Sequence, residues 1–313
     1  MPAPHSALHP QQQPINQPIT LSVAHCLGDI ELTPRRRART AAIVVDVIRA
    51  TTTLAVMFEH GARRVLVARD VEQARQARAS LPLAILAGEV NAVAPSDFDH
   101  GNSPAEWSQL SQARLADHEI LFATTNGARG LHAAIGGGPV FAGSLRNASA
   151  VCSTALTAAR QLARDGEPGE VAIICSGLDA QPAPDDSLCA GWLTRTLQRL
   201  AQQSGVAVEL GAGAQYALDL LAAQYRAHGS PGADDSGMDA DPRRWLEPAL
   251  AETPAAHNIQ RAGLGDDLAW CADVDASTAV PMIAGEDVAL RLVIVEQAPP
   301  NLAAAPVGEA TGG

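Results

Sequence analysis

The sequence predicts an α/β fold with a mixed or largely parallel sheet flanked by helices. Short runs rich in β-branched residues alternate along the chain with Ala-rich stretches of helical character, as in folds built from strand–helix units. Most of these runs, such as 41–45, are apolar without alternation, which is typical of strands that are covered on both faces.

Eight segments have the strand pattern: 21–27, 41–48, 63–68, 83–89, 119–125, 139–145, 170–176 and 289–296. Helices are expected at four further places: 70–80, 147–164, 186–203 and 214–227. Asp70 and Asn147 stand at the starts of the first two helices and suit the N-cap position. The apolar stripe of the third helix is expected to pack on the core.

Three segments differ in composition from the rest of the chain. Residues 1–20, rich in Pro and Gln, and residues 299–313 are expected to be loose, disordered tails. Residues 228–245 are acidic and Gly-rich and are expected to form a surface insertion. No apolar run reaches the roughly 18 residues that a membrane span needs, so we expect a cytoplasmic protein without a membrane partner.

The composition excludes several classes of function. The five cysteines are odd in number and never spaced as C-x-x-C, which argues against a disulfide framework and a structural zinc site. The net charge of −12 argues against nucleic acid as a partner. All 22 basic residues are Arg, so mechanisms that need a Lys Schiff base or a P-loop Lys are excluded.

Side chains that suit a phosphate site stand at the end of the second predicted strand. Asp46 is at its carboxyl end with Arg49 beside it, and the hydroxyls of Thr51 and Thr52 follow at a helix start. Helix-start N–H groups and hydroxyls bind anions, so these residues are candidates for substrate binding. The alternative is that Asp46 is a loop carboxylate and Thr51 a helix cap.

Two more strand ends carry similar groups. Glu89 ends a strand and suits a metal ligand, but the sequence G-N-S-P that follows at 101–104 is also an ordinary helix start. Asn126 and Arg129 follow the next strand, where Arg can bind an anionic group through its planar fork. A simple polar turn is the alternative there.

A fourth strand end leads through a Pro-rich loop to Asp185 and Asp186 at a helix start. Adjacent carboxylates suit Mg²⁺, which prefers oxygen ligands, and they suit a helix N-terminus equally well. His257, followed by Asp267, is a weaker candidate, because a lone His is more often structural than catalytic. The four strand ends are more telling together, since ligands of α/β sheets gather at strand carboxyl ends.

Several other hydrolase classes do not fit. Ile48 stands where a D-x-D aspartyl-phosphate enzyme has its second Asp, and neither Cys152 nor Cys175 is followed by Arg at C-x5-R spacing. The sequence contains no G-x-S-x-G, H-E-x-x-H or G-x-G-x-x-G. These absences exclude the corresponding cysteine phosphatases, serine hydrolases, metalloproteases and dinucleotide-binding enzymes.

Taken in order, five blocks resemble the 2-phosphosulfolactate phosphatase family, which is linked to coenzyme M biosynthesis. The blocks are D-V-I-R-A-T-T-T at 46–53, G-E at 88–89, G-N-S-P at 101–104, T-T-N-G at 124–127, and Asp186 before C-A-G at 189–191. The resemblance covers about residues 20–298, and the first and fourth blocks are long enough to be specific.

The resemblance implies magnesium-dependent hydrolysis of 2-phosphosulfolactate, or of a similar small phosphate monoester, to sulfolactate and phosphate. It also implies two lobes with the active site between them, expected over 21–146 and 147–298. The residues that carry over by motif are Asp46, Arg49, Glu89, Asn126, Arg129 and Asp186, with Gly177 as a point of close backbone approach. Three departures are Ala128, where the family usually has Thr, Asp185, where it usually has Glu, and the segment 228–245, which looks inserted.

Our hypothesis from the sequence is that some of Asp46, Glu89 and Asp186 hold Mg²⁺, which neutralises phosphate oxygens. Arg49 and Arg129 would bind the anionic groups of the substrate, and one carboxylate would orient the attacking water. Two alternatives stay open: a non-catalytic module that senses a phosphorylated metabolite, and a covalent phosphoenzyme at Asp46. The expected partner is a small anionic phosphate ester, and the sequence is compatible with a homodimer.

Overall fold

The computed structural model describes residues 17–31, 33–164, 166–179, 181–229 and 237–302. Most of the two predicted tails, 1–20 and 299–313, lies outside these described residues. Ile19 and Thr20, the last two residues of the first predicted tail, already belong to the first strand.

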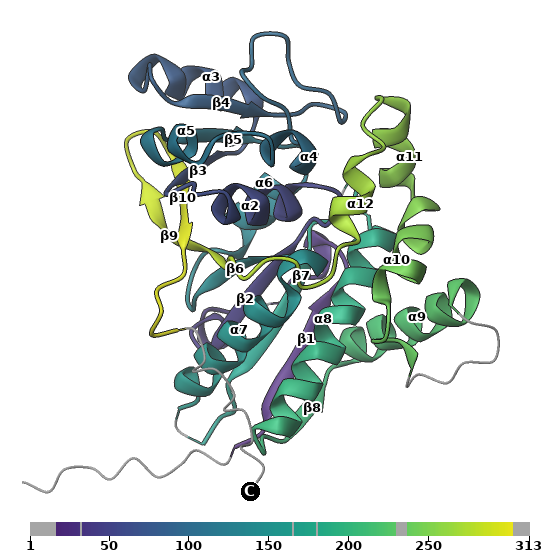
Figure 1. The fold of residues 1–313 in the computed structure, drawn as a ribbon. Helices are drawn as coiled ribbons and strands as arrows, with labels where there is room; N and C mark the ends of the chain where they lie inside the picture. The colour runs from purple at the N-terminus through teal and green to yellow at the C-terminus, as the bar shows by residue number, and fades with distance from the viewer. Residues whose placement is uncertain (1–16, 32, 165, 180, 230–236, 303–313) are drawn as a thin grey trace, which may run out of the picture.

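Ten strands in the described residues form one sheet, in the order β4-β5-β3-β10-β9-β6-β2-β7-β1-β8 (Figure 1). Their bounds are β1 Ile19–Ala24, β2 Thr40–Val45, β3 Val65–Ala68, β4 Ile85–Gly88, β5 Ile120–Ala123, β6 Val140–Gly143, β7 Glu170–Cys175, β8 Val208–Leu210, β9 Pro281–Asp287 and β10 Leu292–Gln297. All eight predicted strands are confirmed, and β8 and β9 are additional.

The sheet consists of two parallel parts joined by one antiparallel hairpin. β4, β5 and β3 are parallel to one another and form what we call the first half-sheet. β6, β2, β7, β1 and β8 are also parallel to one another and form the second half-sheet. The hairpin β9–β10 lies between them and pairs antiparallel with β3 on one side and β6 on the other. The predicted α/β fold with a mixed, largely parallel sheet is therefore confirmed.

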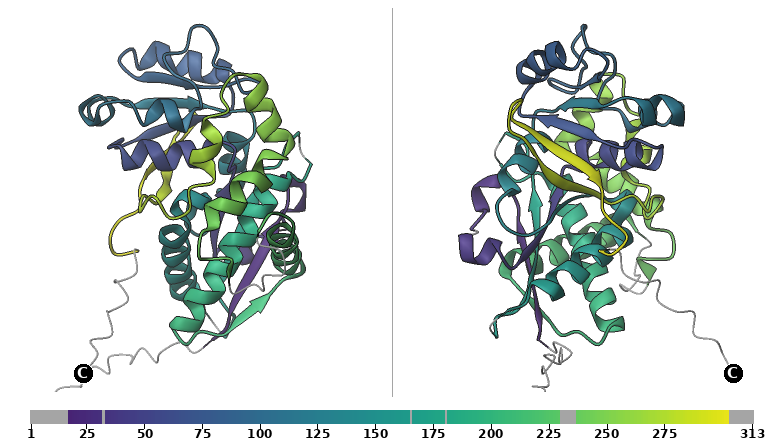
Figure 2. Two further views of the ribbon diagram at one scale, coloured as in Figure 1. Left: turned by 45° about the vertical axis from the view of Figure 1, so that its right-hand side comes forward. Right: turned by 90° about the vertical axis from the view of Figure 1, so that its left-hand side faces the viewer.

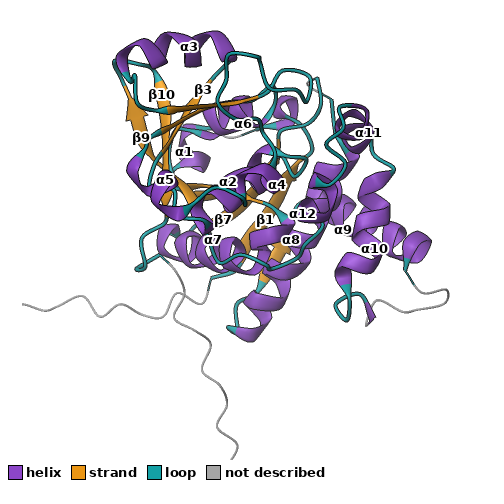
Figure 3. Cartoon of the chain, turned by 45° about the horizontal axis from the view of Figure 1, so that its top comes forward, coloured by secondary structure: helices purple, strands orange, loops and turns teal. Residues whose placement is uncertain are grey.

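Helices lie on both faces of this sheet, as Figures 2 and 3 show. Their bounds are α1 Pro34–Arg37, α2 Ala50–Glu59, α3 Val71–Ser80, α4 Pro104–Trp107, α5 Gln112–Asp117, α6 Gly127–Ala134, α7 Ala148–Leu162, α8 Pro184–Gln203, α9 Ala212–His228, α10 Pro242–Ala251, α11 Pro254–Arg261 and α12 Asp267–Cys271. The four predicted helices are confirmed as α3, α7, α8 and α9. Within the described part of the chain, none of the helices is long and apolar enough to cross a membrane.

The central strand β2 shows why the strands lack alternation. Ile43 and Val45 pack into a core cluster with residues of α7 and α8, whereas Ala42 and Val44 pack into a second cluster with residues of α2 and α6. Successive side chains of a strand point to opposite faces, so a strand covered on both faces needs apolar residues throughout. All of β2 is buried accordingly.

The insertion predicted over 228–245 falls partly on residues 230–236, which lie outside the described residues. In its described remainder, Met238 and Trp245 are each only 2% exposed and join the main core cluster. Trp245 packs edge-to-face on Tyr225 of α9, with ring centroids 5.3 Å apart. This part of the segment therefore anchors α10 on the core. The division into lobes at 146 and 147 stays a prediction.

Candidate active site

A cavity of about 530 Å³ is lined by residues that follow strands of both half-sheets. Asp46 follows β2 and Asp179 follows β7 in the second half-sheet, while Glu89 follows β4 and Asn126 follows β5 in the first. Residues of α11 complete the lining. The structure thus brings the four predicted strand ends to one place, although the strands belong to two separate parallel arrays.

Asp46 is held at the junction between β2 and α2. The backbone N–H of Ala50, the first residue of α2, donates to its Oδ1 over 3.3 Å. Gly127 allows α6 to come close, because a Cβ at this position would lie 2.8 Å from Asp46 Oδ2 and 2.4 Å from the Ala50 Cβ. Burial, and then the nearby charge of Glu89, raise the pKa of Asp46 to about 6.

Two backbone N–H groups of the cavity wall hold the carboxylate of Glu89. Its Oε1 accepts from the N–H of Thr125 over 2.7 Å, and its Oε2 accepts from the N–H of Ala92 over 2.8 Å. The preceding Gly88 has a φ of 141°, and a Cβ there would lie 1.9 Å from the Ala123 carbonyl oxygen. Only glycine lets β4 end this close to β5.

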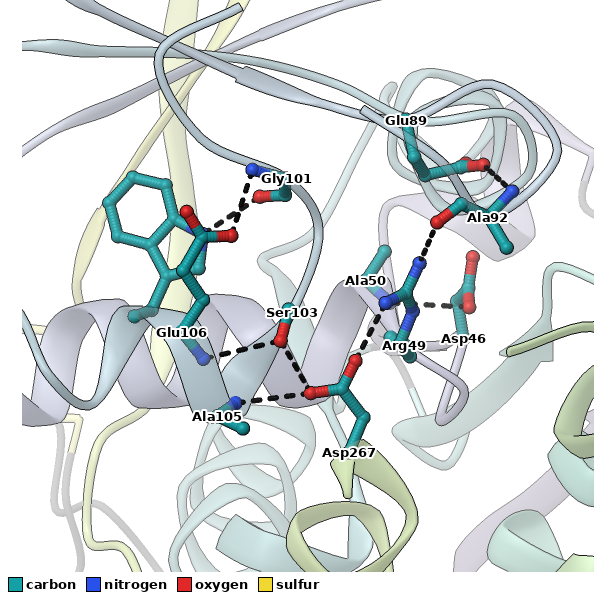
Figure 4. A network of polar contacts seen from close by, with 11 residues as sticks. Asp46, Arg49, Ala50, Glu89, Ala92, Gly101, Ser103, Ala105, Glu106 and Asp267 are labelled. Atoms are coloured by element: carbon teal, nitrogen blue, oxygen red, sulfur yellow. Dashed lines mark hydrogen bonds and ion pairs between the residues drawn. The ribbon is translucent and has the colours of Figure 1, made fainter. Parts of the chain in front are cut away.

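Arg49 forms a buried ion pair with Asp267 of α12. Its Nη1 lies 2.6 Å from Asp267 Oδ2, and the two side chains are 2% and 1% exposed. Its Nη2 donates to the carbonyl oxygen of Ala92 in the cavity wall, and Asp267 also accepts hydrogen bonds from Ser103 Oγ and the Ala105 N–H (Figure 4). The positive charge of Arg49 is therefore already compensated within the protein.

The two predicted substrate-binding threonines do not line the cavity. The hydroxyl of Thr51 donates to the carbonyl oxygen of Asp46 over 2.9 Å, and that of Thr52 donates to the carbonyl oxygen of Val47 over 2.8 Å. Both side chains are fully buried. They stabilise the turn between β2 and α2, and their contact with a substrate stays a prediction.

Asp186 is buried and joins two strand ends. Its Oδ1 accepts from the Val47 N–H over 2.9 Å, and its Oδ2 accepts from the Gly177 N–H over 3.0 Å. Burial and the charge of neighbouring Asp185 raise the pKa of Asp186 well above its ordinary value. Burial also raises the pKa of Asp185, to about 7, and its Oδ1 has no hydrogen-bond partner. The cavity lining does not include Asp185, Asp186 or Gly177.

Arg129 and His257 are exposed, and neither lines the cavity. The structure instead adds cavity-lining residues that the sequence reasoning did not identify, namely Asn91, Asn102, Asp179, Asn258 and Arg261. The last two could have been recognised from Thr253 and Pro254, which cap and start α11. Asn258 and Arg261 are three residues apart in that helix, and positions i and i+3 of a helix share a face.

The donor set can be compared with the needs of a magnesium ion. Among the described residues, no group of three or more His, Cys, Asp or Glu is arranged to hold a metal. Mg²⁺ often takes only one or two protein carboxylates and completes its shell with waters and phosphate oxygens. Asp46 and Glu89 line the cavity and fit that requirement, whereas Asp186 does not line it.

Comparisons with known proteins identify the family of the chain. The family model described as 2-phosphosulpholactate phosphatase matches residues 29–286. A Thermus thermophilus protein is 36% identical over 244 residues, covering 78% of this chain and 87% of that protein. A Deinococcus radiodurans protein is 31% identical over 261 residues, covering 83% and 94%. Both relatives are named as probable 2-phosphosulfolactate phosphatases. Since the match covers most of the chain, including the ends of β2, β4, β5 and β7 around the cavity, the chain belongs to the 2-phosphosulfolactate phosphatase family.

Proposed function

We propose that this chain hydrolyses 2-phosphosulfolactate to sulfolactate and phosphate in the cavity around Asp46. The observation that carries the proposal is that Asp46, Arg49, Glu89 and Asn126 line one cavity of about 530 Å³ in a member of this family. A cavity of this size can enclose a small ester, and its carboxylates and amides supply the polar groups that hydrolysis needs.

In this proposal the phosphate lies between the strand ends and the helix starts. Asn126 at the start of α6 donates to a phosphate oxygen through its side-chain amide. A water attacks phosphorus, its proton passes to Asp46 or Glu89, and the ester oxygen leaves with the electron pair of the P–O bond and takes up a proton. Arg49, fixed by Asp267, contributes a positioned cation in the cavity wall.

We also propose Mg²⁺ as the cofactor, with Asp46 and Glu89 as its protein ligands. When bound there, the ion would supply charge neutralisation for the phosphate oxygens. The contribution of the chain is to hold both carboxylates rigid. Glu89 does so through two backbone N–H groups and Asp46 through the first turn of α2.

The test measures phosphate release from 2-phosphosulfolactate and from a panel of small phosphate monoesters, with Mg²⁺ and with EDTA. We expect turnover of 2-phosphosulfolactate with Mg²⁺ and none with EDTA. Asp46→Asn should be inactive, whereas Asp219→Asn, a matched change at an exposed carboxylate on α9, should match the wild type. Binding of the ester without release would show a sensing module instead. Full activity in EDTA would refute the metal.

We propose a cytoplasmic enzyme that acts on a small phosphate ester in coenzyme M biosynthesis, without nucleic acid or membrane as a partner. The net charge of −12 supports the exclusion of nucleic acid. Size-exclusion chromatography with light scattering tests the proposed homodimer, and fractionation of cells tests the location.

A further inference from the structure

Arg261 is a cavity-lining cation that the established features of the site do not use. It is the last residue of α11, and Asn258, one turn earlier on the same face, lines the cavity with it. Both side chains are exposed at the cavity surface. In Figure 1, α11 lies beside the loops that follow the strands of the first half-sheet. Arg261 therefore reaches the cavity from a wall other than the strand ends.

The guanidinium of Arg261 is held in place but keeps its charge. Its Nε donates to the His257 carbonyl oxygen over 3.2 Å, and its Nη2 donates to Asn258 Oδ1 over 2.6 Å. Neither acceptor is a carboxylate, and Arg261 has no ion-pair partner in the described ranges of the chain. Its remaining N–H donors are available to a ligand.

Arg49, the other arginine of the cavity lining, is in the opposite state. Its charge is compensated by the buried carboxylate of Asp267, and one of its donors is taken by the Ala92 carbonyl oxygen. Arg129, the second predicted anion-binding arginine, does not line the cavity. An anionic group bound in this cavity therefore finds an uncompensated guanidinium at Arg261.

The substrate in the proposed function has more than one anionic group. The phosphate belongs with the strand ends, where Asp46 and Glu89 can hold a metal. The sulfonate is on the carbon next to the one that carries the phosphate and carboxylate, so it extends farthest from the phosphate. Asp46 and Glu89 would repel a second anion placed beside them, and this repulsion directs the sulfonate to another wall.

We infer that Arg261, oriented by Asn258, binds the sulfonate of the substrate and makes the enzyme selective for esters with this second anionic group. This inference rests on the proposed function. A guanidinium fork matches the oxygens of a sulfonate as it matches those of carboxylate and phosphate. The residue acts on specificity, because the group that it binds lies away from the reacting phosphorus.

The first experiment compares kcat/KM for 2-phosphosulfolactate with kcat/KM for 2-phospholactate, in which hydrogen replaces the sulfonate. We expect Arg261→Gln to lower kcat/KM for the sulfonated ester about 10- to 100-fold, mainly through KM, since a hydrogen bond to a charged group is lost. The value for 2-phospholactate should change by less than about threefold, which is below the effect of a single such bond. Arg261→Lys should retain part of the selectivity.

Arg226→Gln is the matched control, because Arg226 is exposed on α9 and does not line the cavity. It removes the same charge from the protein and should leave kcat/KM unchanged for both substrates. Equal losses for both esters in Arg261→Gln would overturn the inference, since they would show a general effect on the site. Unchanged selectivity in that variant would overturn it as well.

A second experiment separates this inference from the proposed function. Calorimetry measures binding of sulfolactate and of lactate to the wild-type protein and to Arg261→Gln, without turnover. We expect the wild type to prefer sulfolactate and the variant to lose that preference. If no ester is hydrolysed but this preference is found, the function fails and the sulfonate site stands. If hydrolysis occurs but both proteins bind the two acids alike, the sulfonate site fails and the function stands.

Discussion

Two arginine–carboxylate pairs lie at opposite ends of the second half-sheet. At the amino ends of its strands, Arg36 of α1 forms a two-bond pair with Glu170, the first residue of β7, at 2.8 and 2.6 Å. At the carboxyl ends, Arg49 makes one bond to Asp267 and one to the carbonyl oxygen of Ala92 in the cavity wall. In the first pair both hydrogen bonds join Arg36 to Glu170. The second pair holds Arg49 in the wall of the cavity.

The pKa values of carboxylates at these two ends are also shifted in opposite directions. Burial by itself would raise the pKa of Glu170, but hydrogen bonds from Arg36 and Ser22 outweigh it and lower the pKa. Burial and the charge of Glu89 instead raise the pKa of Asp46 to about 6. The amino ends of the strands therefore use charge for stability, whereas the carboxyl ends hold unfavourable charge where a substrate or metal can relieve it.

The largest effect is expected from Arg49→Ala, which leaves the Asp267 carboxylate buried without its partner. Removing one member of a buried pair costs about 3–5 kcal/mol of unfolding free energy, and we expect activity to be lost as well. Urea unfolding and phosphate release measure the two effects. In the double variant Arg49→Met/Asp267→Leu, stability should return without activity. Recovered activity in that variant would mean that this pair, like Arg36–Glu170, is only structural.

Asp46→Asn should separate activity from stability. Losing a carboxylate that takes part in proton transfer or metal binding is expected to lower kcat about 10²- to 10⁴-fold. The pKa of Asp46 is raised in the folded state, so its ionised form, which predominates above about pH 6, lowers the stability of the folded protein there. The Tm of the variant at pH 8 should therefore equal or exceed that of the wild type. A lower Tm with normal kcat would contradict this, because Asp46 would then contribute to stability and not to activity.

Glu170→Gln should have the opposite profile. The variant loses the charge in a pair that also holds Ser22 and Thr40, and we expect a loss of about 1–3 kcal/mol in unfolding free energy. The kcat/KM should stay at the wild-type value, because Glu170 does not line the cavity. Chemical denaturation and phosphate release test this prediction. A specific loss of kcat in fully folded protein would contradict it.

The smallest effect is the acid dependence of the same variant. The folded-state pKa of Glu170 lies below its ordinary 4.5, so its stabilisation is present above that pH and is lost as pH falls through the folded-state pKa. The Tm difference between wild type and Glu170→Gln should therefore narrow from pH 5 to pH 3. A difference that stays constant over this range would show that the charge of Glu170 contributes nothing.

How far the sequence predicts this molecule depends on whether the signal is local. β2 and its neighbours were predictable because coverage on both faces demands unbroken apolar runs. β9 is not predictable in this way, because only its first residue is buried and the strand has neither a long apolar run nor a regular alternation. β8 was missed because it has only three residues.

The same distinction holds for the site. That Asp46, Glu89 and Asn126 line one cavity can be predicted, because each comes immediately or shortly after a strand. Asp267 is 218 residues from Arg49 in sequence, and the sequence around neither residue indicates that they form a pair. The threonines of α2 have the residue type of an anion site, but their hydroxyls bond to the preceding backbone turn, which only the three-dimensional path of the chain decides.

The position of the hairpin β9–β10 has a consequence for biosynthesis. These strands come after all the other strands in the chain, yet they occupy the middle of the sheet, between β3 and β6. During translation, both half-sheets must wait with one inner edge unpaired until the hairpin emerges from the ribosome, and unpaired edges invite association with other chains. β3 and β6 therefore obtain these partner strands in the sheet only at the end of synthesis.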